Sequence, residues 1–297
     1  MTGPGWGGAP VPPLPACVRH PDRPTGLSCT RCDRPACPEC LRPAAVGQHC
    51  VECVAQAAGS IPRARTMAGG VSRTVSTPVV TYALMALNIL VFALTAAQSG
   101  GLANQSSSLF RSWQLVPLLV ADGDVVRILG SGFLHSGIVH LAVNMFALYV
   151  IGRDCELVLG RSRYLAVYVV ALLGGAAAVM WLSSPLVATV GASGAVFGLL
   201  GAQAVILVRL RRSPTPVLVV IGLNVVLSIA IPGISLWGHL GGLAAGAAAT
   251  AAVLFVTGSD ARRSRRLGWF GIAGVGLLAL ALIGLRAATL APTLVVG

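Results

Sequence analysis

Four polar side chains in apolar stretches of this chain are of the types that carry out acyl transfer. Ser193 lies in the glycine-rich run VGASGAVFGLLGA. His140 and Asn144 lie in FLHSGIVHLAVNMFALYVIGR, and His239 lies in SLWGHLGGLAAG. A serine hydroxyl becomes a nucleophile when a base removes its proton, and the oxyanion that then develops needs hydrogen-bond donors. His239 could be the base, and His140, Asn144 and the Ser193 backbone N–H could be the donors.

The composition is that of an integral membrane protein. Hydrophobic residues make up 55% of the chain and charged residues 10%, with a mean hydropathy of +0.81, whereas about a quarter of an ordinary soluble chain is charged. The formal net charge of +12 comes from arginines that cluster between apolar runs. We therefore interpret them as topology signals and expect no nucleic-acid partner. The use of arginine alone for basic residues suggests a bacterial genome.

Seven apolar runs are long enough to cross a bilayer. They lie near 79–97, 136–152, 164–182, 193–211, 216–231, 237–256 and 269–287. Arginine clusters precede the first run and separate the second from the third, the fourth from the fifth, and the sixth from the seventh. The positive-inside rule makes these loops cytoplasmic, and the opening MTGPGWGGAPVPPLPA does not resemble a signal peptide. We expect a plasma-membrane protein with a cytoplasmic N-terminus.

The four polar side chains are predicted to lie at one depth. Ser193 lies sixteen residues before Arg209, which is about 24 Å along a helix, and His140 lies thirteen residues before Arg153, or about 20 Å. His239 opens the sixth run. All of them fall in the outer half of a hydrocarbon core about 30 Å thick, where an ionisable side chain is costly unless it has a partner or a function.

A base in this position has no carboxylate to orient it, because the outer halves of the runs contain no Asp or Glu. We therefore expect a Ser-His dyad whose imidazole is held by packing. Phe197, one turn below Ser193, could supply an aromatic surface for His239, although ordinary helix packing explains it equally well. Small residues let two helices approach closely. Those expected between the two helices are Gly191, Gly194, Gly242 and Gly246.

Together these motifs resemble the rhomboid family of intramembrane serine proteases. The resemblance covers about residues 78–256 and rests on G-x-S-G at 191–194, H-x-x-x-N at 140–144 and H-x-x-G-x-x-x-G at 239–246. It implies an all-α polytopic membrane fold with a rhomboid-like core of six helices, to which the seventh run adds one helix. It also implies cleavage of transmembrane protein substrates near the outer membrane face, with no cofactor in the active site.

The resemblance extends to several supporting residues. Glu156, in GRDCELVLGRSRYL, falls at a structural acidic position of the family, and Arg127 resembles the arginine of the first external loop. His135 and Asn88 also fit, although an interfacial group and a helix-packing amide explain them equally well. The family often has Trp before that arginine, and this chain has Val126. This departure concerns the packing of the loop and leaves the catalytic assignment unchanged.

Two other functions are compatible with a polytopic chain. One is a noncatalytic rhomboid-like protein that binds transmembrane clients; such proteins usually lack the serine or the histidine, and this chain has both Ser193 and His239. The other is a transporter, for which the sequence offers no acidic ion-coupling residue in the middle of the membrane.

Seven of the eight cysteines lie between positions 17 and 53, which in a reducing compartment indicates metal binding. Four pairs with C-x2-H or C-x2-C spacing provide eight ligands for two zinc ions. The module resembles a B-box zinc finger, in which alternate pairs share an ion. This pairing gives one site from Cys17, His20, Cys37 and Cys40 and another from Cys29, Cys32, Cys50 and Cys53. Sequential pairing and a substitution of His49 for Cys50 or Cys53 remain alternatives, and Cys155 is given no role.

We expect five segments along the chain. They are a disordered N-terminus (1–16), the small zinc-binding module (17–54), a linker (55–77), the protease core (78–257) and a basic loop with the seventh helix and tail (258–297). Structural zinc sites have closed coordination shells, so the two Zn²⁺ ions are expected to be structural. A cytoplasmic protein partner of the module is possible, and so is a purely stabilising role.

Overall fold

A computed structural model of the chain describes residues 12–60, 77–256 and 260–295. The chain divides into two compact units, Met1–Arg63 and Ala64–Gly297, each of which is described by itself. Most of the expected disordered N-terminus and most of the expected linker lie outside the described residues.

The N-terminal unit is built from short elements around a cysteine-rich core. Its two sheets are antiparallel pairs, β1 (Ala16–Cys17) with β2 (His20–Pro24), and β3 (Leu41–Pro43) with β4 (Gln48–Cys50). A 3₁₀ turn η1 (Pro38–Cys40) precedes β3, and helix α1 (Val51–Ser60) follows β4. Residues 55–60, expected to belong to the linker, therefore continue a helix that begins within the last cysteine pair.

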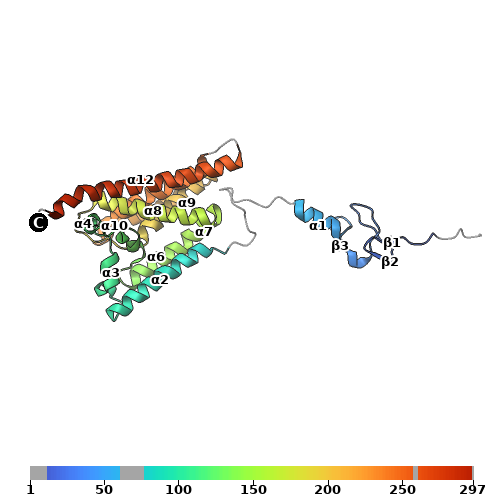
Figure 1. The fold of residues 1–297 in the computed structure, drawn as a ribbon, viewed down its shortest axis with the longest axis horizontal. Helices are drawn as coiled ribbons and strands as arrows, with labels where there is room; N and C mark the ends of the chain where they lie inside the picture. Colours follow the sequence, from blue (N-terminus) through green and yellow to red (C-terminus); the bar gives the residue numbers. More distant parts are fainter. Residues whose placement is uncertain (1–11, 61–76, 257–259, 296–297) are drawn as a thin grey trace, which may run out of the picture. The chain divides into compact units, whose positions relative to one another are not determined.

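The second unit is a bundle of apolar helices, one for each of the seven predicted runs (Figure 1). They are α2 (Val79–Ser99), the continuous helix α6–η4–α7 (Ile138–Leu159), α8 (Arg161–Leu182), α9 (Ser193–Arg209), α10 (Thr215–Ala230), α11 (Leu236–Phe255) and α12 (Ala261–Val295). Among the described residues, five of them are long and apolar enough to cross a membrane, and α9 and α10 are shorter. These observations confirm a mostly helical multi-pass membrane protein with a small N-terminal module.

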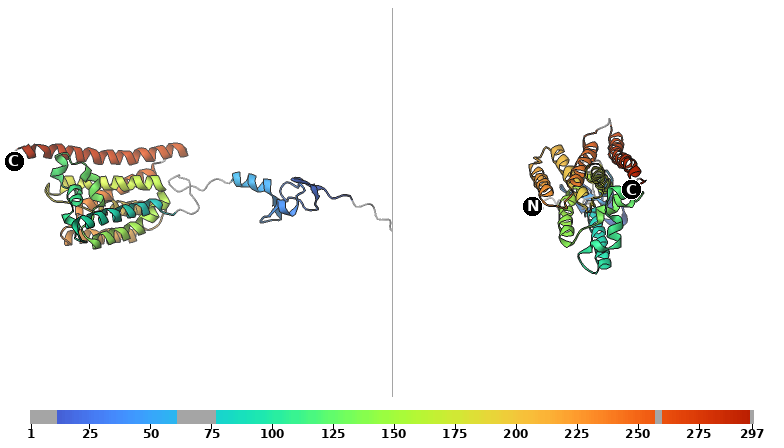
Figure 2. Two further views of the ribbon diagram at one scale, coloured as in Figure 1. Left: turned by 60° about the horizontal axis from the view of Figure 1, so that its bottom comes forward. Right: turned by 90° about the vertical axis from the view of Figure 1, so that its left-hand side faces the viewer.

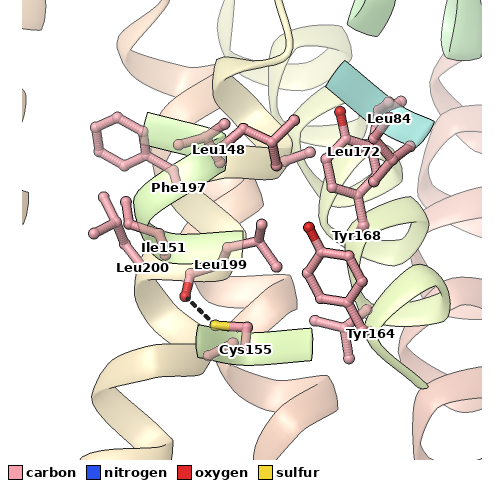
Figure 3. Packing of buried hydrophobic residues seen from close by; sticks show 14 of the residues in the cluster. Leu84, Leu148, Ile151, Cys155, Tyr164, Tyr168, Leu172, Phe197, Leu199 and Leu200 are labelled. Atoms are coloured by element: carbon pink, nitrogen blue, oxygen red, sulfur yellow. Dashed lines mark hydrogen bonds between the residues drawn. The ribbon is translucent and has the colours of Figure 1, made fainter. Parts of the chain in front are cut away.

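Helix α8 forms the centre of the bundle and α12 lies at its periphery. Of the apolar window of each helix, 61% is buried in α8 and 28% in α12. The long helices run roughly parallel (Figure 2), and α12 lies along α8 (Figure 1). Figure 3 shows how Tyr164 and Tyr168 of α8 pack in the core, where the Cys155 thiol donates to the Leu199 carbonyl at 3.5 Å. Cys155 is thus a packing residue of the interior.

Helices α9 and α11 approach so closely at a set of glycines that there is no room for a side chain at these positions. A Cβ on Gly242 would lie 2.0 Å from the carbonyl oxygen of Gly194, and a Cβ on Gly246 would lie 2.2 Å from that of Gly198. Glycine allows this contact because it brings backbone against backbone. The close contact places the first turn of α9 beside the first turns of α11.

The connection between α2 and α6 is folded into short helices. They are η2 (Asn104–Ser106), α3 (Ser108–Trp113), α4 (Pro117–Ala121), α5 (Val126–Gly130) and η3 (Ser131–Phe133). The buried guanidinium of Arg127 donates to the carbonyls of Arg111 at 2.7 Å and Gln114 at 3.0 Å, and it pairs with Asp124 at 3.0 Å. This arginine therefore fastens α5 to α3. Val126 beside it is about half exposed.

A buried carboxylate joins two helices, α2 and α7, at the other end of the bundle. Glu156 of α7 accepts hydrogen bonds from the backbone N–H groups of Val80 and Thr81, at 3.1 and 2.8 Å, and from the Thr81 hydroxyl at 2.8 Å. The first N–H groups of a helix lack partners within the helix, and a negative charge there is favourable. Glu156 thus caps α2 and holds it against α7.

Candidate active site and candidate metal centre

Ser193 is the first residue of α9. The residue before its N-cap, Gly191, has φ +128°, a conformation that favours glycine. The Gly191 N–H donates to the Ser131 carbonyl at 2.9 Å, which joins the turn to the connection between α2 and α6. The first N–H groups of a helix have no intrahelical partner and carry its positive partial charge. Ser193 therefore lies where backbone donors are available for an oxyanion.

A small cavity that is open to solvent lies at Ser193. Its wall comes from the connection between α2 and α6, the α8–α9 loop, and helices α8, α9 and α11. The polar and small residues that line it include Ser131, Thr189, Gly191, Ser193, Ser235 and Gly238. Gly238 immediately precedes His239 in α11. The cavity thus brings the serine together with the helix turn that carries the expected base.

The imidazole of His239 is buried and held on two sides. Its ring lies parallel to that of Phe197, with centroids 4.0 Å apart and an interplanar angle of 8°. Its Nδ1 lies 2.8 Å from the Ser228 hydroxyl oxygen. Ser228 also donates to the carbonyl of Asn224, one turn earlier in α10, at 2.7 Å. A hydroxyl has a single proton, so while Ser228 donates to Asn224 its oxygen can accept from Nδ1–H, and Nε2 of His239 then keeps its lone pair.

His140 adopts the opposite arrangement. Its Nδ1 accepts a hydrogen bond from the Ser136 backbone N–H at 3.2 Å, so the proton of the neutral ring is on Nε2. A Cβ placed on Gly191 would lie 2.9 Å from this Nε2 and 3.5 Å from the Ser193 hydroxyl oxygen. The Nε2–H of His140 and the hydroxyl of Ser193 therefore border the same small space beside Gly191.

The remaining predicted polar residues lie around His140. Asn144 is buried, and its Nδ2 donates to the His140 carbonyl at 2.9 Å, which leaves its second N–H available. The ring of His135 packs edge-on against His140, with centroids 5.1 Å apart. His135 thus supports the ring of His140 and does not reach the residues that line the cavity.

The arrangement provides the groups that acyl transfer requires. Nε2 of His239 can accept a proton, Nε2–H of His140 can donate to an oxyanion, and Ser193 supplies the hydroxyl at a helix N-terminus. Sequence reasoning missed Ser228 and expected packing alone to orient His239. The signal available in the sequence was Ser228 itself, a second polar side chain near the end of the apolar run that precedes His239.

The cysteine module contains two groups of four potential metal ligands. Cys17, His20, Cys37 and Cys40 form one group, and Cys29, Cys32, Cys50 and Cys53 form the other. The pairs alternate along the chain, as in the B-box-like arrangement, and are not sequential. His49 lies in β4 opposite Arg42 and is in neither group.

The ligand separations fit a tetrahedral ion. Nδ1 of His20 lies 3.8, 3.4 and 3.4 Å from the sulfurs of Cys17, Cys37 and Cys40, and the sulfurs of Cys32 and Cys50 are 3.8 Å apart. Tetrahedral zinc with bonds of about 2.3 Å to sulfur and 2.0 Å to nitrogen requires ligand separations of about 3.5–3.8 Å. Both groups can therefore bind a metal ion.

Each ligand group contains thiols whose pKa is lowered and thiols whose pKa is raised. Burial raises the pKa of Cys40 to about 11, and the Cys50 thiol together with burial raises that of Cys53 to about 12. Hydrogen bonds to the sulfur from backbone N–H groups, first that of Cys37, lower the pKa of the Cys17 thiol to about 6. The Arg34 guanidinium donates to the sulfur of Cys32 at 3.4 Å and lowers its pKa. A thiolate is the form of cysteine that coordinates metal.

Comparison with known proteins agrees with this geometry. Residues 122–256 match the family model of the rhomboid domain. The chain is 35% identical over 181 residues to rhomboid protease GluP of Bacillus subtilis (strain 168), a match that covers 59% of this chain and 35% of that one. It is 32% identical over 155 residues to rhomboid protease AarA of Providencia stuartii, covering 46% of this chain and 55% of the relative.

A plant relative is named without an activity. RHOMBOID-like protein 4 of Arabidopsis thaliana is 34% identical over 127 residues, which are 40% of this chain and 32% of the relative. The chain thus spans between about a third and about a half of the length of these three relatives.

Proposed function

We propose, from the match of residues 122–256 to the family model of the rhomboid domain, that the protein is an intramembrane serine endopeptidase that cleaves transmembrane protein substrates. Ser193 is the nucleophile and His239 is its general base. The observation that carries the proposal is that two histidines lie near Ser193 and that their hydrogen bonds favour opposite tautomers. Nδ1 of His239 faces the Ser228 oxygen, and Nδ1 of His140 accepts from the Ser136 N–H.

The chemistry follows from these tautomers. Nε2 of His239 takes the hydroxyl proton as the Ser193 oxygen attacks the scissile carbonyl carbon. The negative charge that forms on the carbonyl oxygen is stabilised by Nε2–H of His140, the free N–H of Asn144 and the backbone N–H groups at the start of α9. When the C–N bond breaks, His239 returns the proton to the leaving amine. A water molecule, deprotonated by the same nitrogen, then hydrolyses the acyl-enzyme and regenerates Ser193.

The position of the site in the membrane follows from the arginines. The end of α9 away from Ser193 carries Arg209, and α8 begins at Arg161, so the positive-inside rule assigns those ends to the cytoplasm. Ser193 then opens toward the outer face, and cleavage takes place near that face. The two ligand groups of the N-terminal module hold structural zinc in the cytoplasm, and neither ion takes part in the reaction.

A noncatalytic protein that retains transmembrane clients is the second candidate. It is disfavoured by the presence of both the serine and the buried histidine.

The decisive experiment measures cleavage of a labelled transmembrane substrate by the purified protein in detergent. We expect Ser193→Ala and His239→Ala each to abolish cleavage, and a fluorophosphonate probe to label the wild-type protein but not Ser193→Ala. Ser213→Ala is a matched control, because Ser213 is exposed and its hydroxyl bonds to Thr215. Cleavage retained by either active-site variant would refute the dyad. Client binding without cleavage or probe labelling would favour the noncatalytic function.

A further inference from the structure

The only buried residues of α10 are Val217 and Ser228. The rest of this helix is half-buried or exposed, including apolar side chains such as Val219 and Ile229. A buried serine on such a helix requires a reason, because a buried hydroxyl is costly unless it is hydrogen-bonded. Its partners are the Asn224 carbonyl and Nδ1 of His239.

We propose that Ser228 is a positioning residue that fixes the tautomer and the ring orientation of His239. The inference rests on the proposed function and extends it from a dyad to a chain of three groups, Ser193, His239 and Ser228. Ser228 itself touches neither the substrate nor the reacting atoms. It acts by keeping the proton of the neutral imidazole on Nδ1, so that the lone pair of Nε2 is available to Ser193.

The direction of the hydrogen bonds supports this role. When the Ser228 hydroxyl donates to the Asn224 carbonyl at 2.7 Å, its oxygen accepts at 2.8 Å from Nδ1–H, and all three groups are satisfied at once. If the imidazole carried its proton on Nε2 instead, the Ser228 hydroxyl would have to leave the Asn224 carbonyl in order to donate to Nδ1. The hydrogen bond that one ring nitrogen makes sets the role of the other.

The packing of the ring makes the hydrogen bond necessary. The Phe197 ring, parallel to the imidazole at 4.0 Å, fixes the plane of the ring. Stacking alone would also allow the imidazole to be rotated by half a turn about its Cβ–Cγ bond while it stays in contact with Phe197. This rotation would place a ring carbon instead of a ring nitrogen at the position that faces Ser193. The Ser228 hydroxyl distinguishes the two orientations because only Nδ1–H can donate to it.

The same contact gives α10 a functional link to the site. Helices α9 and α11 are held together by backbone contacts at Gly242 and Gly246, so Ser193 and His239 keep their positions without α10. Ser228 is the point at which α10 acts on His239. A displacement of α10 that broke this contact would leave α9 and α11 packed together, but His239 would lose the hydrogen bond that orients it.

The test measures the tautomer of His239 and the activity of the protein in two separate experiments. In wild-type protein with ¹⁵N-labelled histidine, assigned by the signal lost in His239→Gln, we expect the neutral imidazole of His239 to carry its proton on Nδ1. Ser228→Ala should populate both tautomers and lower kcat and the rate of fluorophosphonate labelling about tenfold, as expected for one lost hydrogen bond in the transition state. KM should stay within about twofold. Ser228→Thr should restore most of kcat, and Ser213→Ala should match the wild type.

The outcomes separate this inference from the proposed function. A wild-type proton on Nε2, or an unchanged kcat in Ser228→Ala, would overturn the role of Ser228 while leaving the protease intact. An equal loss in Ser228→Ala and Ser228→Thr, together with a lower melting temperature, would overturn it in favour of a packing role. A wild-type protein that neither cleaves nor labels, but carries the His239 proton on Nδ1, would refute the protease and retain the tautomer assignment.

Discussion

The imidazole of His239 lies parallel to the phenyl ring of Phe197, with centroids 4.0 Å apart and planes inclined by 8°. The two rings belong to neighbouring helices, α11 and α9, and Phe197 lies one turn below Ser193 on the same helix. The proposed nucleophile and the ring that packs against the proposed base therefore belong to one helix. A change in the ring should alter the position of the base while leaving that of the serine unchanged.

Phe197→Leu should lower kcat by about three- to tenfold, because a ring contact of this kind contributes about 0.5–1.5 kcal/mol beyond its buried area. Phe92→Leu is the matched control, since Phe92 is equally buried in the core but belongs to α2. Both variants should lose similar thermal stability, and only Phe197→Leu should lose kcat. Equal activities of the two variants would show that the stacked ring has no role in positioning His239.

The close contact between α9 and α11 leads to a second prediction. Gly242→Ala would place a Cβ 2.0 Å from the Gly194 carbonyl oxygen, so the helices must separate near the turns that carry Ser193 and His239. We expect a destabilisation of about 1–3 kcal/mol, typical of an overpacked interior, and loss of probe labelling at temperatures where the protein remains folded. Gly222→Ala is the control, because no atom lies within 4 Å of its Cβ position. Normal labelling of Gly242→Ala would contradict the proposed coupling.

Much of this arrangement could be predicted from the sequence. The seven apolar runs gave seven helices because a bilayer requires backbone hydrogen bonds to be satisfied within each segment. The spacing of H-x-x-G-x-x-x-G indicated which face of α11 meets α9, since positions 239, 242 and 246 share one side of a helix. The cysteine pairs indicated a metal module because two ligands separated by two residues can bind one ion.

Other features depend on information that local sequence does not carry. Ser228 is one small polar residue in an apolar run, and its contact with His239 depends on how α10 packs against α11. Residues 55–60 have the small-residue composition of a linker, yet alanine is also the strongest helix former, and they are helical. The π-helical turn at 148–152 joins α6 to α7; it was not predicted from the sequence.

The seventh helix supports the cavity from outside the core. Ala279 and Ile283 of α12 belong to one buried cluster with Leu115, Ala176 and Val179, and these last three residues also line the cavity at Ser193. Ile283→Ala should cost about 2 kcal/mol or more of stability, as for a buried isoleucine, and should raise KM more than it lowers kcat, because the cavity wall moves while the dyad does not.

The control for this prediction is Leu285→Ala, since Leu285 is 57% exposed on the same helix. It should resemble the wild type in melting temperature and in KM. If Ile283→Ala changed stability alone, α12 would serve only to hold the bundle together.

The last prediction concerns the cysteine module. Its two ligand groups have separations suited to tetrahedral zinc, and metal binding supplies much of the folding free energy of such small modules. Purified protein should therefore contain about two zinc ions per chain, and Cys29→Ser should reduce this to about one. A strong chelator should expose residues 17–54 to protease while substrate cleavage continues, because Ser193 and His239 belong to the other compact unit. About one zinc ion in the wild type would contradict the two-site arrangement. Loss of cleavage on chelation that zinc restores in the wild type but not in Cys29→Ser would show that the module controls the protease.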